Sequence, residues 1–297
     1  MHITVLKNET INKISIDPNA NYIDCTLGHG GHTLSLLEKL NNKGFVTSID
    51  QDTEAIKVAK EKLNKTDYIN FNIVNNNFKN INTIIKDNKL NNIKGIIYDL
   101  GVNSNQFDID NRGFSYKTDK ELDMRMDSKS DLTAKKILNT YSEDMLNKIF
   151  KEYGEIKDSK KIAKAIINKR NIIPINKTFE LNNTIDNLNI NSQKILKQVY
   201  QSLRIEVNDE FESLKKSLEQ AIDSIAVDGV VCVITFHSLE DKITKDIFYK
   251  YKSIFFDNGK EIKHKFKTTK TIYPSAKEVE SNRRSRTAKL RVIKRIY

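Results

Sequence analysis

The spacing of apolar residues divides the chain into three stretches. Up to about residue 100, short apolar runs alternate with segments in which apolar residues recur at helical spacing. Strands are predicted at residues 22–25, 45–50, 69–74 and 95–100. Helices are predicted at 32–40 and 53–63, with a weaker one around Ile81, Ile84 and Ile85. Repeated strand–helix units predict a parallel sheet with helices on both faces.

The second stretch is irregular and then helical. A segment rich in Asn, Asp and Gly runs from Asn103 to Met126, and apolar residues at helical spacing follow for about 80 residues. Helices are predicted around 134–138, 142–150, 162–166 and 192–203, with Ser142 as an N-cap and a stop before Pro174. Because no strand-like run interrupts them, residues 105–205 are predicted to be an inserted all-helical domain.

The third stretch returns to the α/β pattern. A helix is predicted over 211–225, a turn at Asp228-Gly229, a buried strand over 230–236, a helix starting at Ser238, and a half-buried strand over 288–296. The predicted fold is therefore α/β, with a Rossmann-like sheet formed by residues 1–104 and 206–297 around the insertion.

Length and composition narrow the class of protein. The chain has 297 residues, of which 38% are hydrophobic and 30% charged, as in a globular protein. No apolar run reaches the roughly 18 residues that span a bilayer, and the first residues lack a targeting pattern. The two cysteines, Cys25 and Cys232, and the five histidines show neither disulfide nor metal-ligand spacing. We expect a cytoplasmic protein without a membrane segment or metal.

The net charge of +11 is unevenly distributed. Residues 242–297 hold 17 Lys and Arg against 5 Asp and Glu, a net of +12, so the first 241 residues are almost neutral. A basic segment beside a neutral body indicates a polyanionic partner such as RNA or DNA. The alternative is a solvated surface in a lysine-rich proteome.

A glycine-rich loop follows the first predicted strand. Residues 24–32 read D-C-T-L-G-H-G-G-H, and Gly28, Gly30 and Gly31 would let the backbone turn sharply beside a ligand. Asp50 ends the next strand, where adenosine-binding α/β folds place a carboxylate that accepts hydrogen bonds from ribose. The loop lacks the G-x-G-x-x-G dinucleotide fingerprint, which disfavours a dehydrogenase. An ordinary turn with an exposed Asp remains the alternative.

Asp99 ends the fourth predicted strand. Ligands of open parallel sheets bind beyond the carboxyl ends of the strands, so Asp99 is predicted to face the bound adenosine cofactor. The alternative is an Asp that caps the following turn.

Ordered motifs along the whole chain carry a resemblance to a known family. They are His2-x-x-Val5-Leu6, Tyr22 to Asp24, Thr26, Gly28, Gly30 to His32, Ile49-Asp50-x-Asp52, Asp99 to Val102, Gln106, Arg112 to Tyr116, Leu122 to Met126, Tyr153 to Glu155, Leu203 to Glu210, Phe236 to Asp241 and Arg284 to Arg286. The chain resembles the ribosomal RNA small subunit methyltransferase H family, which methylates N4 of a cytidine in the decoding region of 16S rRNA.

The resemblance implies a class I methyltransferase fold, the cofactor S-adenosyl-L-methionine, and 16S rRNA or the small ribosomal subunit as partner. The implied cofactor contacts are Gly30, Gly31, His32, Asp50, Phe78, Asp99 and Gln106. Without the resemblance, Phe78 would be a core aromatic, His32 a surface histidine and Gln106 a loop residue. Asp99 is also the predicted catalytic residue, because a hydrogen-bond acceptor beside the exocyclic amine would stabilise the positive charge that develops on it.

Two departures from the family pattern lie together. The family usually reads D-L-G-V-S-S-P-Q, whereas this chain has Asn103 in place of a serine and Asn105 in place of the proline. Without the fixed φ of proline, we expect a looser loop before Gln106.

Several basic and aromatic residues are candidates for RNA contact. Guanidinium and aromatic groups could hold an unpaired base and its phosphates, and the candidates are Arg112, Phe114, Tyr116, Arg125 and Arg204. They could instead define the fold.

Two further groups of candidates lie nearer the C-terminus. His237 and Ser238 end a strand of the sheet and could touch the target base, or Ser238 could be an N-cap with Asp241 three residues on. Arg283, Arg284 and Arg286 are predicted to contact phosphates.

Other functions remain open at this point. They are a methyltransferase acting on another nucleic acid and a ribosome assembly factor that binds the cofactor without activity. A homodimer is also left open.

Overall fold

The computed structural model describes residues 3–101, 112–188, 192–253, 255–257 and 262–297. The chain divides into two compact units, Met1–Gly101 with Phe211–Tyr297, and Val102–Glu210. We call them the α/β unit and the helical unit.

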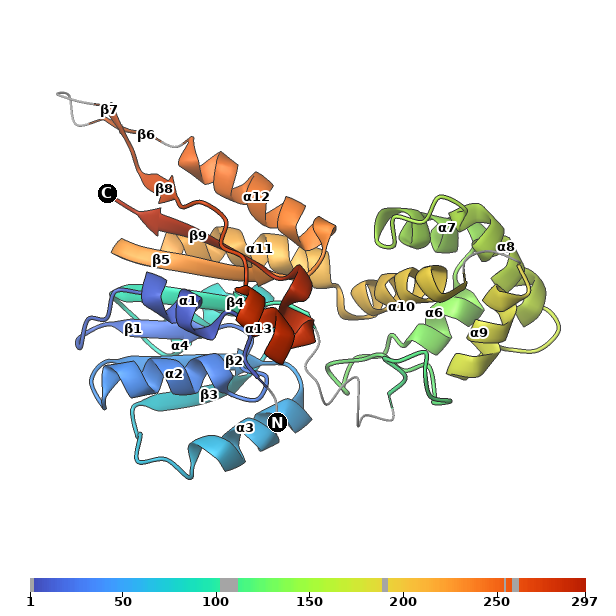
Figure 1. Ribbon diagram of the computed structural model, residues 1–297, viewed down its shortest axis with the longest axis horizontal. Helices are drawn as coiled ribbons and strands as arrows, with labels where there is room; N and C mark the ends of the chain where they lie inside the picture. Colours follow the sequence, from blue (N-terminus) through green and yellow to red (C-terminus); the bar gives the residue numbers. More distant parts are fainter. Residues whose placement is uncertain (1–2, 102–111, 189–191, 254, 258–261) are drawn as a thin grey trace. The chain divides into compact units, whose positions relative to one another are not determined.

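The described part of the α/β unit contains a seven-stranded sheet of order β3-β2-β1-β4-β5-β9-β8 (Figure 1). Its strands are β1 (Asn21–Asp24), β2 (Phe45–Asp50), β3 (Phe71–Asn75), β4 (Ile93–Asp99), β5 (Ile225–Thr235), β8 (Phe266–Thr268) and β9 (Lys289–Arg295). Strands β1 to β5 are parallel, while β9 and β8 are antiparallel. The strand order reverses between β1 and β4, which places their carboxyl ends at a topological switch point.

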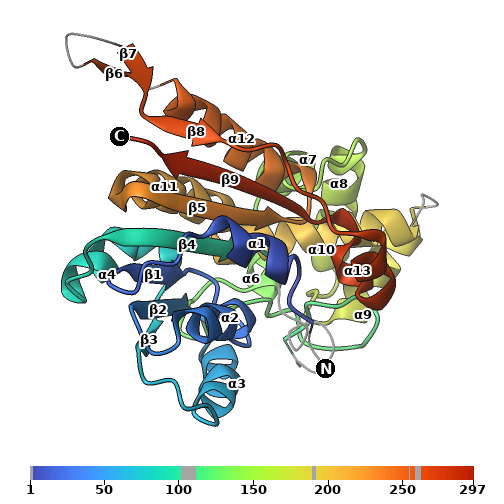
Figure 2. The same cartoon turned by 60° about the vertical axis from the view of Figure 1, so that its left-hand side comes forward.

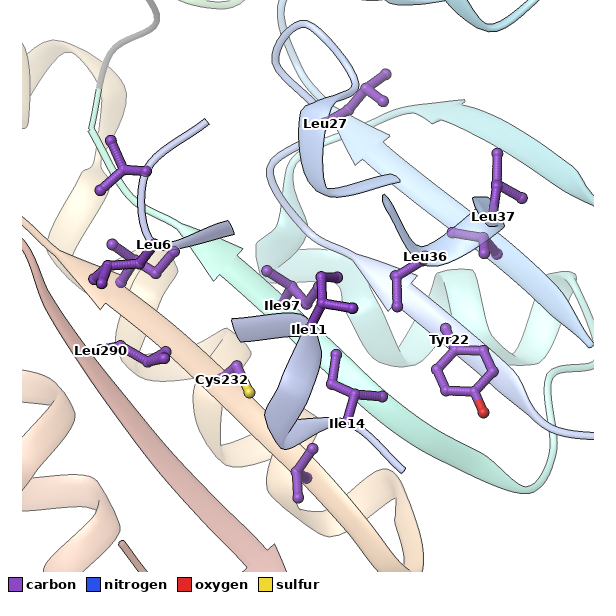
Figure 3. Packing of buried hydrophobic residues seen from close by; sticks show 14 of the residues in the cluster. Leu6, Ile11, Ile14, Tyr22, Leu27, Leu36, Leu37, Ile97, Cys232 and Leu290 are labelled. Carbon is purple, nitrogen blue, oxygen red and sulfur yellow. The ribbon is translucent and has the colours of Figure 1, made fainter. Parts of the chain in front are cut away.

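Helices cover both faces of this sheet (Figures 1 and 2). Each face has a hydrophobic core of its own. One core contains residues of α1 (Lys7–Lys13), α2 (Gly31–Leu40) and α3 (Thr53–Leu63), and the other contains residues of α4 (Ile81–Asp87), α11 (Glu210–Ser224) and α12 (Ser238–Lys252). Alternate residues of a strand enter opposite cores, as Tyr22 and Ile23 do in β1. Figure 3 shows the first core, where Ile11 and Leu36 meet Ile97 and Cys232. The predicted α/β fold is confirmed.

The described residues of the helical unit have a core of their own. Its helices are α6 (Ala134–Thr140), α7 (Glu143–Glu152), α8 (Ser159–Arg170), α9 (Thr178–Asp186) and α10 (Ser192–Asn208). Ser142 caps α7 as predicted, because its Oγ accepts the N–H of Met145 at 3.2 Å. Helix α9 was not predicted, since Thr178, Asn182 and Thr184 fill positions on its buried side and hide its apolar period.

The predicted turn at Asp228-Gly229 is wrong. Strand β5 runs through these residues, with Asp228 at a φ of 66° and a shift of register between β4 and β5. The paired residues advance from Ile93 to Gly95 in β4 but from Ile225 to Val230 in β5, so β5 holds three extra residues here. Such an irregularity also favours positive φ, which explains why the residues look like a turn.

The C-terminal segment contains elements that the sequence pattern missed. These are a ribbon of β6 (Phe255–Asp257) and β7 (Ile262–His264), the short strand β8, helix α13 (Ala276–Ser281) and the 3-10 helix η2 (Arg283–Thr287). Glu278 Oε1 accepts the N–H of Leu6 at 2.7 Å, and Asn282 Nδ2 donates to the carbonyl of Ile3 at 3.1 Å. The basic segment is thus tied to the N-terminal residues.

None of the helices in the described ranges is both long and apolar enough to cross a membrane.

Candidate active site

The loop after β1 turns at two glycines. Gly28 and Gly30 have φ values of 49° and 71°, and the N–H of Gly30 donates to the carbonyl of Leu27 at 2.7 Å. Gly30 is also the N-cap of α2. Because residues with a Cβ rarely adopt this left-handed conformation, the two glycines fix the turn as the sequence predicted.

Gly31 has a different role from the other two glycines. A Cβ placed on Gly31 would overlap Oγ1 of Thr4. The missing side chain therefore makes room for the N-terminal segment, which packs on the first turn of α2. At Gly31 the missing side chain thus allows a close contact within the protein, with Thr4, and not with a ligand.

Asp50 joins the glycine loop to the end of β2. Its Oδ2 accepts the N–H of Gly28 at 2.8 Å, and its Oδ1 accepts the N–H of Asp52 at 2.9 Å. Burial raises the pKa of Asp50 to about 6 in spite of these two donors. Each carboxylate oxygen can accept a second hydrogen bond, so the residue keeps the capacity to bind ribose hydroxyls.

Asp99 lies at the carboxyl end of β4 and is tied to the loop by Thr26. The N–H of Asp99 donates to Oγ1 of Thr26 at 2.6 Å, and the N–H of Thr26 donates to Oδ1 of Asp24 at 3.1 Å. The side chain of Asp99 is 21% exposed, yet its Oδ1 is buried and has no hydrogen-bond partner among the described residues. A buried carboxylate oxygen without a donor indicates a ligand that brings one.

His32 is buried beside Asp99. Its side chain is 3% exposed, and its Nε2 lies 3.6 Å from Oδ2 of Asp99. The alternative of a surface histidine is therefore wrong, because the first turn of α2 faces the strand ends.

Asp24 completes this group of charged residues. It is fully buried, and its Oδ2 accepts the hydroxyl of Thr33 at 2.7 Å. Burial raises the pKa of Asp24, although His32 and Thr33 oppose this. Burial alone would lower the pKa of His32, but Asp99 and Asp24 outweigh it, so its pKa is raised. Asp24 of β1, His32 of α2 and Asp99 of β4 thus form an Asp–His–Asp cluster in which the central histidine is stabilised in its charged form.

Phe78 begins the 3-10 helix η1 (Phe78–Asn80) after β3. Its ring makes an edge contact with Tyr98, with the centroids 5.7 Å apart, and its carbonyl accepts the hydroxyl of Ser217 at 2.8 Å. The ring is partly buried against the second core. It has the position of a core aromatic that is only partly buried, and stacking on adenine stays a prediction.

Gln106 lies outside the described residues, together with Asn103 and Asn105. The prediction for Gln106 as a cofactor contact is therefore carried by the resemblance alone.

The RNA candidates of the helical unit are engaged in contacts within that unit. Arg125 pairs with Asp123, with Nε and Oδ1 2.7 Å apart, and Arg204 Nε lies 2.8 Å from Glu210 Oε1. Phe114 is only 4% exposed, and the guanidinium of Arg112 lies 5.6 Å from the centre of its ring. These contacts fit the alternative that the residues define the fold.

Tyr116 has similar surroundings in the helical unit. Its ring is partly buried in an edge contact with Tyr200, with the centroids 5.7 Å apart. A base-binding role for Tyr116 and its neighbours stays a prediction.

The start of α12 differs by one residue from the predicted cap. The N-cap is His237, and Glu240, not Asp241, accepts the N–H groups of Phe236 and His237 at 2.8 and 3.3 Å. Asp241 instead binds Arg291 Nε at 2.6 Å and Lys289 Nζ at 2.9 Å, which fastens α12 to β9. Ser238 is the first helical residue and is exposed.

The three arginines of η2 are exposed. Arg283, Arg284 and Arg286 flank the buried Ser285. Arg284 interacts electrostatically with His29 of the glycine loop, whose pKa is lowered by burial, Lys62 and Arg284. The C-terminal basic segment and the glycine loop are therefore neighbours within the α/β unit.

The sequence pattern did not single out Asp24 and Thr26 as site residues. A signal was available, because Asp24 ends a strand just as Asp50 and Asp99 do.

In the described ranges, no group of three or more His, Cys, Asp or Glu side chains is arranged to hold a metal ion.

Comparison with known proteins finds a matching family and close relatives over the whole chain. The model of the MraW methylase family matches residues 1–296. Proteins named ribosomal RNA small subunit methyltransferase H are 46% identical in Mycoplasma mycoides subsp. mycoides, 44% in Clostridium botulinum strain Kyoto and 42% in Caldicellulosiruptor saccharolyticus. Each match covers 99% of both chains. A solved structure of a putative rRNA-methylase from Clostridium thermocellum matches over 100% of both chains, with 12% identity and a TM-score of 0.49.

Proposed function

This chain belongs to the MraW methylase family, and we propose that it transfers a methyl group from S-adenosyl-L-methionine to small-subunit ribosomal RNA. The acceptor in this proposal is N4 of a cytidine in the decoding region of 16S rRNA. The observation that carries the proposal is Oδ1 of Asp99, which is buried without a hydrogen-bond partner in the described part of the chain and lies beside a glycine loop at the switch point of the sheet.

The residues at the strand ends fit the cofactor. Asp50 keeps capacity for the ribose hydroxyls, and the turn at Gly28 and Gly30 leads into the N-terminus of α2. Phe78 lies just after the end of β3 and is only partly buried, which leaves part of its surface for the adenine. When bound, S-adenosyl-L-methionine would supply an electrophilic methyl group on a sulfonium that is a good leaving group.

The acceptor amine is the harder partner to activate. The lone pair of a cytosine N4 amine is delocalised into the ring, so the nitrogen attacks poorly. We assign Asp99 to accept a hydrogen bond from this amine, which favours pyramidal nitrogen and stabilises the positive charge that grows on it. In this role the Asp99 carboxylate, or water, would take up the proton that N4 loses when it gains the methyl group.

Binding of the RNA is assigned mainly to the C-terminal basic segment. Arg283, Arg284 and Arg286 are exposed, and Arg284 is within electrostatic reach of the glycine loop. Phosphates held there would lie on the same unit as Asp99. The helical unit is proposed as a substrate domain that carries further RNA contacts.

The location proposed for this reaction is the cytoplasm. Both cysteines are free and buried, as expected in a reducing compartment. A homodimer stays a prediction that sedimentation of the purified chain would decide.

The test is mass mapping of modified cytidines in small-subunit rRNA from cells with and without this protein. We expect one N4-methyl mark to vanish in the deletion strain and to return with the wild-type gene. If the mark persists without the protein, the proposed substrate is wrong. Complementation with Asp99→Ala separates the alternative of an inactive assembly factor, because such a factor would restore subunit assembly regardless of that substitution.

A further inference from the structure

His32 has surroundings that its predicted role as a cofactor contact does not explain. The imidazole is 3% exposed, and both of its nitrogens are buried without a hydrogen-bond partner among the described residues. The nearest opposite charge is Oδ2 of Asp99, 3.6 Å from Nε2. The charged group nearest to the ring is thus a side chain of the protein itself.

The charges around His32 all favour its protonated form except one. Asp99 and Asp24 attract the proton, and Lys7 is the cation that opposes it. Asp24 is fully buried and has fixed donors in Thr26 and Thr33, so it cannot turn away to water. A buried carboxylate needs a compensating charge, and His32 is placed to provide it for Asp24 and Asp99 together.

The two oxygens of Asp99 are then used differently. Oδ2 faces the imidazole, whereas Oδ1 is buried and has no partner in the described part of the chain. The backbone of Asp99 is held by Thr26 at 2.6 Å, so rotation of the carboxylate is the freedom that remains. An opposite charge at Oδ2 removes that freedom and leaves Oδ1 for the substrate amine.

Resting on the proposed function, we propose that His32 is a positioning residue. It holds the Asp99 carboxylate turned, so that Oδ1 accepts the hydrogen bond from the methylated amine. Asp24 in turn keeps His32 charged. His32 touches neither the amine nor the methyl group in this arrangement.

The first test uses the purified protein without cofactor or RNA. The ring protons of His32 are followed by NMR as pH is raised, in the wild type and in Asp99→Asn and Asp24→Asn. We expect the wild-type midpoint above the ordinary 6.5 and a lower midpoint in both variants. The exposed His264 on β7 is the internal control for an intact fold, and its ring signals at one fixed pH should be the same in all three proteins. An unchanged His32 midpoint in Asp99→Asn overturns the proposal.

The second test separates positioning from cofactor contact. We expect His32→Gln to lower kcat by about 10- to 100-fold, a typical loss for a residue that orients a reacting group, with little change in KM for S-adenosyl-L-methionine. The fall of kcat as pH rises through the raised pKa of His32 should disappear in this variant. His264→Gln is the matched control. A raised KM with unchanged kcat would instead make His32 a cofactor contact and overturn the proposal.

The two tests also keep this proposal apart from the proposed function. A wild-type protein that fails to methylate small-subunit rRNA refutes the function, while the NMR titration still reports whether His32 and Asp99 are coupled. An active wild type with an unaffected His32→Gln refutes only the positioning role.

Discussion

Asp99 in the α/β unit and Arg125 in the helical unit were both marked by the sequence for ligand binding, and their surroundings differ completely. Asp99 keeps a buried oxygen without any hydrogen-bond donor in the described residues. Arg125 donates to both oxygens of Asp123 and to the carbonyls of Ser128 and Ser130. Residue type suggested function equally for both, but unused hydrogen-bonding capacity distinguishes a group prepared for a ligand from one that holds the fold.

The largest expected effect is that of Asp99→Ala on catalysis. The variant should lose about 10³-fold or more in kcat, or about 4 kcal/mol of transition-state stabilisation, because the amine loses its acceptor. Its circular dichroism and melting temperature should stay close to wild type. Single-turnover methylation of small-subunit rRNA measures the loss. If the variant methylates at the wild-type rate, Asp99 is not the catalytic acceptor, and its unpaired oxygen does not distinguish it functionally from Arg125.

The next effect concerns stability in the helical unit. Phe114→Ala should cost about 3 kcal/mol of unfolding free energy, because the ring is buried in the core and its removal leaves a cavity. Denaturant unfolding measures this cost. Tyr116→Phe is the matched control and should unfold near the wild-type denaturant concentration. If Phe114→Ala were as stable as wild type but bound RNA poorly, the base-binding prediction would be preferred after all.

The same contrast shows how far sequence alone can go. The pattern located β2 and α3 to the residue, because six and eleven residues carry a full strand or helix period. Strands β6, β7 and β8 have three residues each, too few for any period. The irregularity in β5 was taken for a turn, since Asp-Gly favours positive φ in both.

The candidate site was predictable where it follows from topology. Asp50 and Asp99 end parallel strands, so their position at one edge of the sheet follows from the strand pattern. The burial of His32 against Asp99 depends on how α2 packs, which no local spacing encodes. Phe114 was ambiguous for the same reason, because the sequence alone does not distinguish an aromatic residue that stacks on a base from one that fills a core.

A smaller effect is expected from the titration of Asp50. Its raised pKa of about 6 means that the folded protein takes up a proton more readily than the unfolded chain, with its ordinary 3.8. Stability contributed by this group is therefore greatest at low pH and is lost as pH rises through about 6. Cofactor affinity should have the opposite sign, because ribose hydroxyls donate to the ionised carboxylate.

Calorimetric titration with S-adenosyl-L-methionine checks this sign. Below pH 6, affinity should fall by up to about tenfold for each pH unit, since binding must release the proton. Asp50→Asn is isosteric and cannot titrate, so its affinity should be weaker but nearly independent of pH. An equal pH dependence in both proteins would assign the proton to another group.

The smallest expected effect is the one that tests the basic segment. Replacing Arg283, Arg284 and Arg286 together by alanine should weaken RNA binding several-fold and lower the slope of log affinity against log salt by about 2, since each contact with a single-strand phosphate adds about 0.7. The matched control replaces the exposed residues Lys43, Lys86 and Lys89, which precede β2 and β4, by alanine. This control variant loses the same three positive charges as the arginine variant. Filter binding at several salt concentrations measures both slopes, and cofactor affinity should be unchanged in either variant. Because the two triple variants have equal net charge, a shared loss would reflect only the overall field of the protein. A larger loss of RNA affinity in the arginine variant would assign the phosphate contacts to η2, beside the glycine loop. The arginines of η2 would then bind a ligand, as proposed for Asp99, whereas Arg125 holds the fold.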